Sequence, residues 1–438
     1  TQFREDAGPT AHPVQPDVYQ AIDNFYTTTI YEKGSELIRM LHTLLGEETF
    51  MRGMALYVSR HDGSAATCED FVQAMQDAHE QDQQAGKSDS AGLDFAQFRR
   101  WYHQAGTPVL QIQRHWDGEQ GVLELLIRQQ TPPTPGQHDK QPVVIPLAIG
   151  LVGQGGEPLS LSHHSEQSPG VRSTSLPLQW GKHSRLLVID KAETQLRFSG
   201  LPRQHHPPAL SLLRQFSAPV KLEMGRPVAE LVHLLAHDSD PVARWDAGQL
   251  LLRRALLARA AGQSDAQLED ELTDAFGRIL VDPGLSQASR AVLLALPGAA
   301  ELEDAATDQG QHPDPPALFA AAQALRRQLG EALAQPLLEL LEDCRSQWDQ
   351  PWPRGQGDRR LTGLIWSWRA AAGDAAVIAE ARAAVDGPSM TLARQGLSAL
   401  HPHDLVAREQ AMTAFFERWQ HKPVILDSWF GLQASTPF

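Results

Sequence analysis

The spacing of apolar residues changes twice along the chain and divides it into segments of different secondary structure. Residues 1–106 and 218–438 place their apolar residues with the period of amphipathic helices. Residues 107–217 instead hold short runs of Val, Leu and Ile separated by turn residues. A chain of 438 residues is long enough for two or three domains. We therefore predict a multidomain α+β protein whose domains are these three segments.

The first segment predicts several helices that pack on one another. One helix face is marked by apolar residues at helical spacing, namely Leu37, Ile38, Leu41, Leu44 and Leu45. Thr67 and Asp70 have the spacing of a capping box, which begins a further helix. The polar stretch 80–92 predicts an exposed loop. A closing aromatic helix follows it, with Phe95, Phe98, Trp101 and Tyr102.

The middle segment predicts a small β-sandwich. Its strand candidates are residues 109–113, 122–127, 143–152, 186–189 and 195–198. Turn-forming sequences separate them, including Asp117-Gly118, Pro169-Gly170, and residues 132–136 and 153–156. Short strands with frequent turn signals are typical of two antiparallel sheets packed face to face.

The last segment is rich in Ala and Leu and predicts an α-helical solenoid. Asp240 precedes Pro241 as a helix cap, and later helices are expected at about 264–281, 315–330, 331–345, 359–371, 388–399 and 404–419. Brief turns between such helices favour stacked antiparallel pairs. The acidic run 301–308 is interpreted as a solvated face. Residues 429–432 are too apolar for a polar terminal cap, so we expect the solenoid to be truncated.

Composition excludes several classes of partner. The net charge of -15 disfavours nucleic acid and anionic lipid surfaces. No apolar run approaches the roughly 18 residues of a membrane span, so no membrane partner is expected. Cys68 and Cys344 fit no metal or redox spacing. A reducing, cytoplasmic setting is therefore expected.

The histidines provide no convincing metal site. His233 and His237 share a helix face, but Leu234 stands where a metallopeptidase helix carries its general base. A structural or solvent-facing role is expected for this pair. His163-His164 and His205-His206 lie in predicted loops and are expected to be solvated. No His-Glu-x-x-His sequence occurs anywhere in the chain.

Residues 24–34, Asn-Phe-Tyr-Thr-Thr-Thr-Ile-Tyr-Glu-Lys-Gly, resemble the catalytic-tyrosine segment of the zinc aminopeptidase N family, the bacterial branch of the gluzincin aminopeptidases. Further stretches resemble that family in the same order, namely residues 61–67, 98–102, 216–222 and 244–247. By itself, Tyr31 would be only a tyrosine at the start of an amphipathic helix. The resemblance implies that Tyr31 is the catalytic tyrosine and that Tyr26 lines the pocket for the first substrate side chain.

The resemblance also implies a fold and an activity. The segments would be the rear helical part of a thermolysin-like catalytic domain (1–106), a β-sandwich (107–217) and an α-helical solenoid (218–438). The family removes N-terminal residues from peptides with a zinc-activated water. Its zinc ligands, general base and amine-binding motif have no match in this chain. We therefore expect zinc in the parent protein, no metal ligand among these residues, and no activity from this chain alone.

Two alternatives remain open at this stage. One is a binding scaffold for peptides or proteins, in which the solenoid presents a concave surface. The other is complementation by a separate chain, a missing N-terminal catalytic half that bears the zinc site. If the chain is part of an enzyme, on one polypeptide or on two, the expected partners are peptide substrates. Residues 1–106 would then expose an apolar face, and we expect the isolated chain to aggregate.

Overall fold

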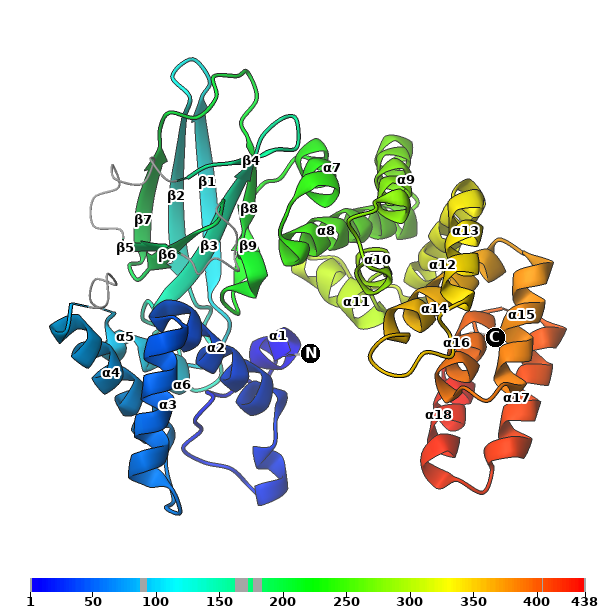
Figure 1. Ribbon diagram of the computed structural model, residues 1–438, viewed down its shortest axis with the longest axis horizontal. Coiled ribbons are helices and arrows are strands. Elements are labelled where there is room, and N and C mark those ends of the chain that lie inside the picture. Colours follow the sequence, from blue (N-terminus) through cyan, green and yellow to red (C-terminus); the bar gives the residue numbers. More distant parts are fainter. Residues whose placement is uncertain (1, 87–92, 162–171, 176–182, 404, 437–438) are drawn as a thin grey trace. The chain divides into compact units, whose positions relative to one another are not determined.

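The computed structural model describes residues 2–86, 93–161, 172–175, 183–403 and 405–436. The chain forms two compact units, Thr1–Ala243 and Arg244–Phe438. Helices, a pair of sheets and a second run of helices follow one another along the sequence (Figure 1). The predicted order of helical, sheet and helical segments is thereby confirmed.

The first unit begins with helices α1 (Gln2–Ala7), η1 (Ile22–Phe25), η2 (Thr29–Lys33), α2 (Gly34–Leu45), α3 (Glu47–His61), α4 (Cys68–Gln84), α5 (Phe95–Phe98) and α6 (Arg100–His103). The capping box is confirmed, because Thr67 Oγ1 accepts from Asp70 N and the Asp70 carboxylate accepts from Thr67 N. The aromatic segment forms two short helices whose four predicted aromatic side chains are all buried.

The predicted loop over residues 80–92 is wrong in its first part. Helix α4 continues to Gln84, since its inner face still buries His79 and Asp82. The Asp82 carboxylate accepts a hydrogen bond from Thr49 Oγ1 at 2.6 Å, which fastens this last turn to α3. The helix was not predicted here because its inward face is itself partly polar, so the sequence shows no apolar period. Residues 87–92 lie outside the described residues.

Two sheets form the β-sandwich. The strands are β1 (Val109–Asp117), β2 (Val122–Gln130), β3 (Ile145–Val152), β4 (Pro158–Leu159), β5 (Arg172–Ser175), β6 (Arg185–Ile189), β7 (Glu193–Phe198), β8 (Ala209–Leu212) and β9 (Lys221–Glu223). One sheet has the order β7-β2-β1-β9. The other has the order β4-β3-β6-β5, and β8 also pairs with β3. Each predicted strand is present, and every residue of β3 is buried.

Four strands escaped prediction because each is too short to show a period: β4, β5, β8 and β9. Strand β9 pairs in parallel with β1. The sheet thus continues past the boundary predicted at 217. The predicted turn Pro169-Gly170 lies outside the described residues.

A strained turn after β8 connects the sandwich to the helices of the first unit. Leu213, Gln215 and Phe216 have φ angles of 51°, 56° and 53°, which only glycine adopts freely. Asp240 Oδ2 accepts from Gln215 N at 3.0 Å, and Arg39 Nη1 of α2 donates to Gln215 O at 2.8 Å. These contacts hold the turn in place and attach α2 to the sandwich.

Helix α7 (Val228–His237) closes the first unit, and α8 (Pro241–Ala260) crosses the boundary between the units. The predicted cap is confirmed, since Asp240 Oδ1 accepts from Val242 N and Ala243 N. The second unit then contains α9 (Ala266–Val281), α10 (Gln287–Leu293), α11 (Ala299–Asp308), α12 (Pro315–Ala332), α13 (Ala334–Arg345), α14 (Gln356–Ala371), α15 (Ala375–Asp386), α16 (Met390–Leu400), α17 (Val406–Trp419) and α18 (Pro423–Ala434). All the predicted helices are present.

Helices of the second unit that are separated in the sequence pack closely on one another. The ring of Trp368 in α14 stacks on Phe276 of α9, with centroids 5.9 Å apart. Gly330 of α12 admits the backbone of α14, because a Cβ there would lie 2.3 Å from Trp368 O. The acidic run 301–308 is largely the helix α11, which buries Leu302 and Ala306. Its charges therefore occupy only one face of the helix.

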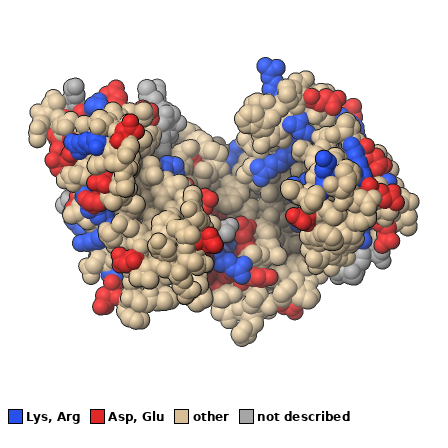
Figure 2. Space-filling model, turned by 90° about the horizontal axis from the view of Figure 1, so that it is seen from below, with Lys and Arg blue, Asp and Glu red and all other residues tan. Residues whose placement is uncertain are grey.

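Charged side chains of both signs lie on the surface. Acidic and basic side chains are interspersed on the face shown in Figure 2. Within the ranges that the structure describes, no helix combines the length and the apolar character needed to cross a bilayer.

Candidate functional site

Tyr31 lies on a π-helical turn, η2, that leads directly into α2. The turn begins where Ile30 N donates to Thr27 Oγ1 at 3.1 Å and Tyr31 N donates to Thr27 O at 3.1 Å. The Tyr31 side chain is 57% exposed. Single π-helical turns are rare and occur often at functional sites. The sequence places a hydroxyl-bearing ring on such a turn and leaves it open to solvent.

Tyr26 and Tyr31 lie side by side. Their ring centroids are 6.1 Å apart, and Tyr26 is 61% exposed. Phe25 packs edge-on against Tyr26, and Tyr19 packs edge-on against Phe25. The two tyrosines thus belong to a small exposed aromatic surface made by the segment before α2.

The Glu5 carboxylate secures the beginning of the π turn. Thr29 N and Thr29 Oγ1 donate to Glu5 Oε1 at 2.8 and 2.7 Å, and Thr28 Oγ1 donates to Glu5 Oε2 at 2.6 Å. Burial opposes the charge of Glu5. These hydrogen bonds, with His12 3.8 Å away, outweigh burial and lower the pKa of Glu5 to about 2.

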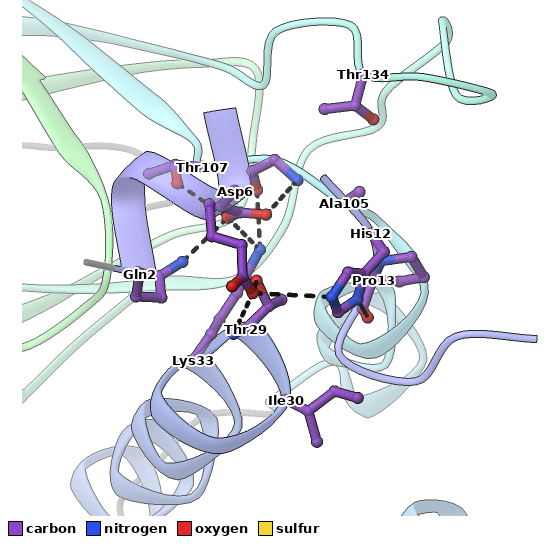
Figure 3. A network of polar contacts seen from close by, with 12 residues as sticks. Gln2, Asp6, His12, Pro13, Thr29, Ile30, Lys33, Ala105, Thr107 and Thr134 are labelled. Carbon is purple, nitrogen blue, oxygen red and sulfur yellow. Dashed lines mark hydrogen bonds and ion pairs between the residues drawn. The ribbon is translucent and has the colours of Figure 1, made fainter. Parts of the chain in front are cut away.

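A buried ion pair secures the end of the same turn (Figure 3). Lys33 Nζ donates to Asp6 Oδ2 at 2.7 Å and to Gly106 O at 2.9 Å. Asp6 also accepts from Gly106 N at 2.8 Å and from Thr107 Oγ1 at 2.9 Å. Burial lowers the pKa of Lys33, and the Asp6 carboxylate opposes that shift. Helix α1, the π turn and the approach to β1 therefore meet at one satisfied network.

Sequence reasoning missed Glu5 and Asp6 and assigned Lys33 no role of its own. Lys33 falls inside the quoted motif, but a charged residue in an amphipathic segment is usually at the surface. Its burial follows from a partner 27 positions earlier in the chain, and no local pattern shows that pairing. A conserved Asp would be the only available signal, and a single sequence cannot supply it.

The two histidines that share a helix face, His233 and His237, contact neighbouring parts of the fold and each other. His233 Nε2 lies 2.7 Å from Gly153 O, and the rings of His233 and His237 are 4.8 Å apart. His163 and His164 lie outside the described residues. Over the part of the chain that the structure describes, no three His, Cys, Asp or Glu side chains gather as a metal site would require. These residues therefore do not fit a zinc ion.

The arrangement is suited to donating one hydrogen bond to a reacting atom. A tyrosine hydroxyl stays protonated at neutral pH because its reference pKa is about 10. It can stabilise an oxyanion that forms beside it in a transition state. Because η2 is held at both ends, the backbone that carries Tyr31 is held in one position. Among the described residues, no cluster of three metal-ligating side chains accompanies this donor.

Family models match the chain in three consecutive segments. Residues 1–88 match the peptidase family M1 domain, residues 106–225 match a domain of unknown function with an Ig-like fold (DUF3458), and residues 228–438 match a domain of unknown function described as ARM repeats (DUF3458_C). The order corresponds to the helical, sheet and helical segments of the structure.

Full-length matches to individual proteins agree with these models. Aminopeptidase N of Escherichia coli is 36% identical and that of Caulobacter vibrioides is 37% identical, each over the whole chain. The chain covers 47% and 46% of those proteins, so it spans about half the length of the curated relatives it matches. A crystal structure of Legionella pneumophila aminopeptidase A in complex with aspartic acid has a similar fold, with a TM-score of 0.78 and 22% sequence identity. The match covers 99% of this chain and 47% of that protein. The chain is thus similar over its whole length to aminopeptidase N proteins, and its first 88 residues match the peptidase family M1 domain.

Proposed function

We propose that this chain forms part of a zinc aminopeptidase that removes N-terminal amino acids from peptides. The observation that carries the proposal is Tyr31, exposed on a π turn that is fixed at both ends. Its hydroxyl would donate to the oxyanion formed when water attacks the scissile carbonyl. Tyr26, whose ring is 6.1 Å away, would line the pocket for the first substrate side chain.

Zinc would be held outside these residues. The sequence has no His-Glu-x-x-His, and the described residues hold no cluster of metal ligands. When bound in the whole protein, zinc would activate the attacking water. The ligands would come from a further catalytic segment, on the same polypeptide or on another. A lone hydrogen-bond donor cannot replace that chemistry, so this chain by itself should be inactive.

We also propose a cytoplasmic setting for the protein. Cys68 and Cys344 are both free thiols in the structure, and Cys344 is buried. Unpaired cysteines are typical of proteins in reducing compartments.

The first test is hydrolysis of alanyl-p-nitroanilide by the purified chain, with zinc added and a chelator control. We expect no chelator-sensitive turnover. The companion protein is a chimaera with the N-terminal half of the Escherichia coli aminopeptidase N ahead of this chain, and it should hydrolyse the reporter in a zinc-dependent way.

Either of two results would contradict the proposal. Chelator-sensitive turnover by the chain alone would mean that these residues hold a metal site, with His233 and His237 the first to mutate. A folded chimaera that binds zinc but stays inactive would instead favour a non-catalytic scaffold. Circular dichroism and zinc analysis of the chimaera separate that second result from a failure to fold.

A further inference from the structure

A cavity of about 510 Å³ lies within the second unit, far along the chain from Tyr31. Helices α10, α11, α12, α14 and α16 and the loop before α11 contribute its walls. Most of the lining is apolar and includes Leu302, Leu318, Phe319, Ala322, Leu364 and Trp368. The cavity is partly open to solvent, and its volume falls within the range of about 300–1,000 Å³ that is usual for small-molecule sites.

Two arginines bring positive charge to this cavity. Arg326 of α12 and Arg360 of α14 both line it. Neither guanidinium makes a hydrogen bond or an ion pair with any residue in the described ranges. Burial lowers the pKa of Arg326, and no carboxylate among the described residues offsets that cost. A partly buried cation without an anion is unfavourable unless something else supplies the negative charge.

Gln323 adds an unpartnered amide on the same wall. It precedes Arg326 by one helical turn, so the two side chains share a face of α12. Its Nε2 and Oε1 atoms are both buried, and neither has a hydrogen-bond partner among the described residues. Buried amides are normally paired, because desolvation without a hydrogen bond is costly. A donor amide and a guanidinium thus lie on one side of a mostly apolar cavity.

We propose that this cavity binds a small organic carboxylate that carries an apolar side chain. The Arg326 guanidinium and the Gln323 amide donate to the carboxylate, and the side chain packs against Phe319 and Trp368. This chemistry has two sources, the C-terminal residue of a peptide and a free amino acid. Glu303, the acidic residue on the wall, would meet the ammonium group that only a free amino acid carries. The cavity belongs to the second unit and Tyr31 to the first, and the test of the cavity does not depend on peptidase activity.

Calorimetric titration of the full chain with three probes tests the proposal. N-acetyl-leucine represents the end of a peptide, leucine represents the free amino acid, and N-acetyl-leucinamide lacks the carboxylate. We expect at least one of the two acids to bind, and the amide to bind at least about 10-fold more weakly, as charge-assisted hydrogen bonds require. The tighter of the two acids identifies the source.

Variants on α12 assign the binding to this wall. R326M should weaken binding of the acid about 10-fold or more, and Q323L should weaken it by a smaller factor. R327M is the matched control, because Arg327 is the next residue on the same helix and donates to Ala371 O instead of lining the cavity. It should leave the affinity unchanged.

Several outcomes would overturn the proposal. One is that neither N-acetyl-leucine nor leucine binds. Another is that N-acetyl-leucinamide binds as tightly as the acids. A third is that R326M and R327M lose the same amount of affinity. Thermal unfolding of R326M gives a further check, because removing a cation that has no partner within the described ranges should not lower Tm. A drop of several degrees would mean that Arg326 stabilises the fold through a partner, and the ligand assignment would be wrong.

Discussion

At the scale of single residues, the position of Tyr31 depends on charges that lie elsewhere in the sequence. Glu5 holds Thr28 and Thr29 at the beginning of the turn, and Asp6 holds Lys33 at its end. None of these groups need touch a substrate. They fix the backbone that carries the hydroxyl, so their removal should act first on stability and through it on the geometry of the site.

Tyr31→Phe tests the catalytic role of the hydroxyl directly. In the zinc-bearing chimaera we expect kcat to fall about 10²–10³-fold, the usual loss for one oxyanion donor, with little change in KM. Tyr19→Phe is the control, since Tyr19 is 53% exposed in the same aromatic surface. A higher KM with unchanged kcat would make Tyr31 a binding residue and refute the proposed role.

Asp6→Asn tests the buried ion pair. The variant leaves the Lys33 ammonium buried without its counter-ion, and we expect a loss of about 3–5 kcal/mol in the free energy of unfolding at pH 7. Burial already lowers the pKa of Lys33, so the folded state tolerates the neutral amine better. The loss should therefore shrink as the pH rises toward about 10.

Glu193→Gln provides the control for that measurement. Glu193 pairs with Arg128 at 2.9 Å, and the two side chains are 48% and 49% exposed. Such a surface pair contributes less than about 1 kcal/mol. Equal costs for the two variants in urea unfolding would mean that the Asp6 and Lys33 pair is no more important than a surface contact.

At the scale of elements, the π turn is held by hydrogen bonds from outside itself. Thr28 and Gly34 flank it, and no side chain of its own caps it. Glu5 supplies acceptors for the start of the turn from another helix. The stability of η2 is therefore coupled to α1 and to the ionisation of one carboxylate.

Glu5→Gln predicts a distinct pH dependence. The folded chain lowers the pKa of Glu5 from about 4.5 to about 2, so the charged form stabilises the fold above about pH 4.5. That contribution is lost as the pH falls from about 4.5 to about 2. We expect the variant to be about 1–3 kcal/mol less stable at pH 7, with the difference vanishing near pH 2.

Urea unfolding of wild type and Glu5→Gln at a series of pH values measures this difference in the free energy of unfolding. The other carboxylates titrate in both proteins, so their contribution cancels in the difference. Glu119→Gln is the control, because Glu119 is exposed and its side chain makes no hydrogen bond within the described ranges. A stability difference for Glu5→Gln that does not change with pH would show that the carboxylate charge is not responsible.

At the scale of the molecule, several exposed apolar side chains lie close together in the N-terminal part of the chain. Val18, Tyr19, Ile22, Tyr26 and Tyr31 are all exposed within a short segment. Met51 and Val58 of α3 are exposed as well. Apolar groups gathered in this way mark a surface that associates with other surfaces.

We expect the purified chain to self-associate through this surface as its concentration rises, because association removes apolar side chains from water. Sedimentation velocity over a range of concentrations measures it. A double variant, Val18→Ser with Ile22→Ser, should reduce association, whereas Val424→Ser, an equally simple change at an exposed valine of the second unit, should not. A monodisperse monomer at high concentration would contradict the prediction.

The sequence by itself determined the order of helical and sheet segments, because the period of apolar residues is a local property. It also determined local caps such as Thr67 with Asp70, whose partners are three residues apart. The resemblance in residues 24–34 brought Tyr26 and Tyr31 forward, and their roles stay predictions. Strands of two to four residues, such as β4 and β8, could not be found, since so few residues cannot show an alternation.

Only the tertiary structure decided which charges are buried and where a cavity is left between the helices. The pairing of Lys33 with Asp6 joins residues 27 positions apart, and the contact of Lys33 with Gly106 joins residues 73 apart. The cavity beside Arg326 needs the side chains of five helices to face one another. Such features depend on the distances between elements, and a one-dimensional pattern carries no record of those distances until the chain is folded.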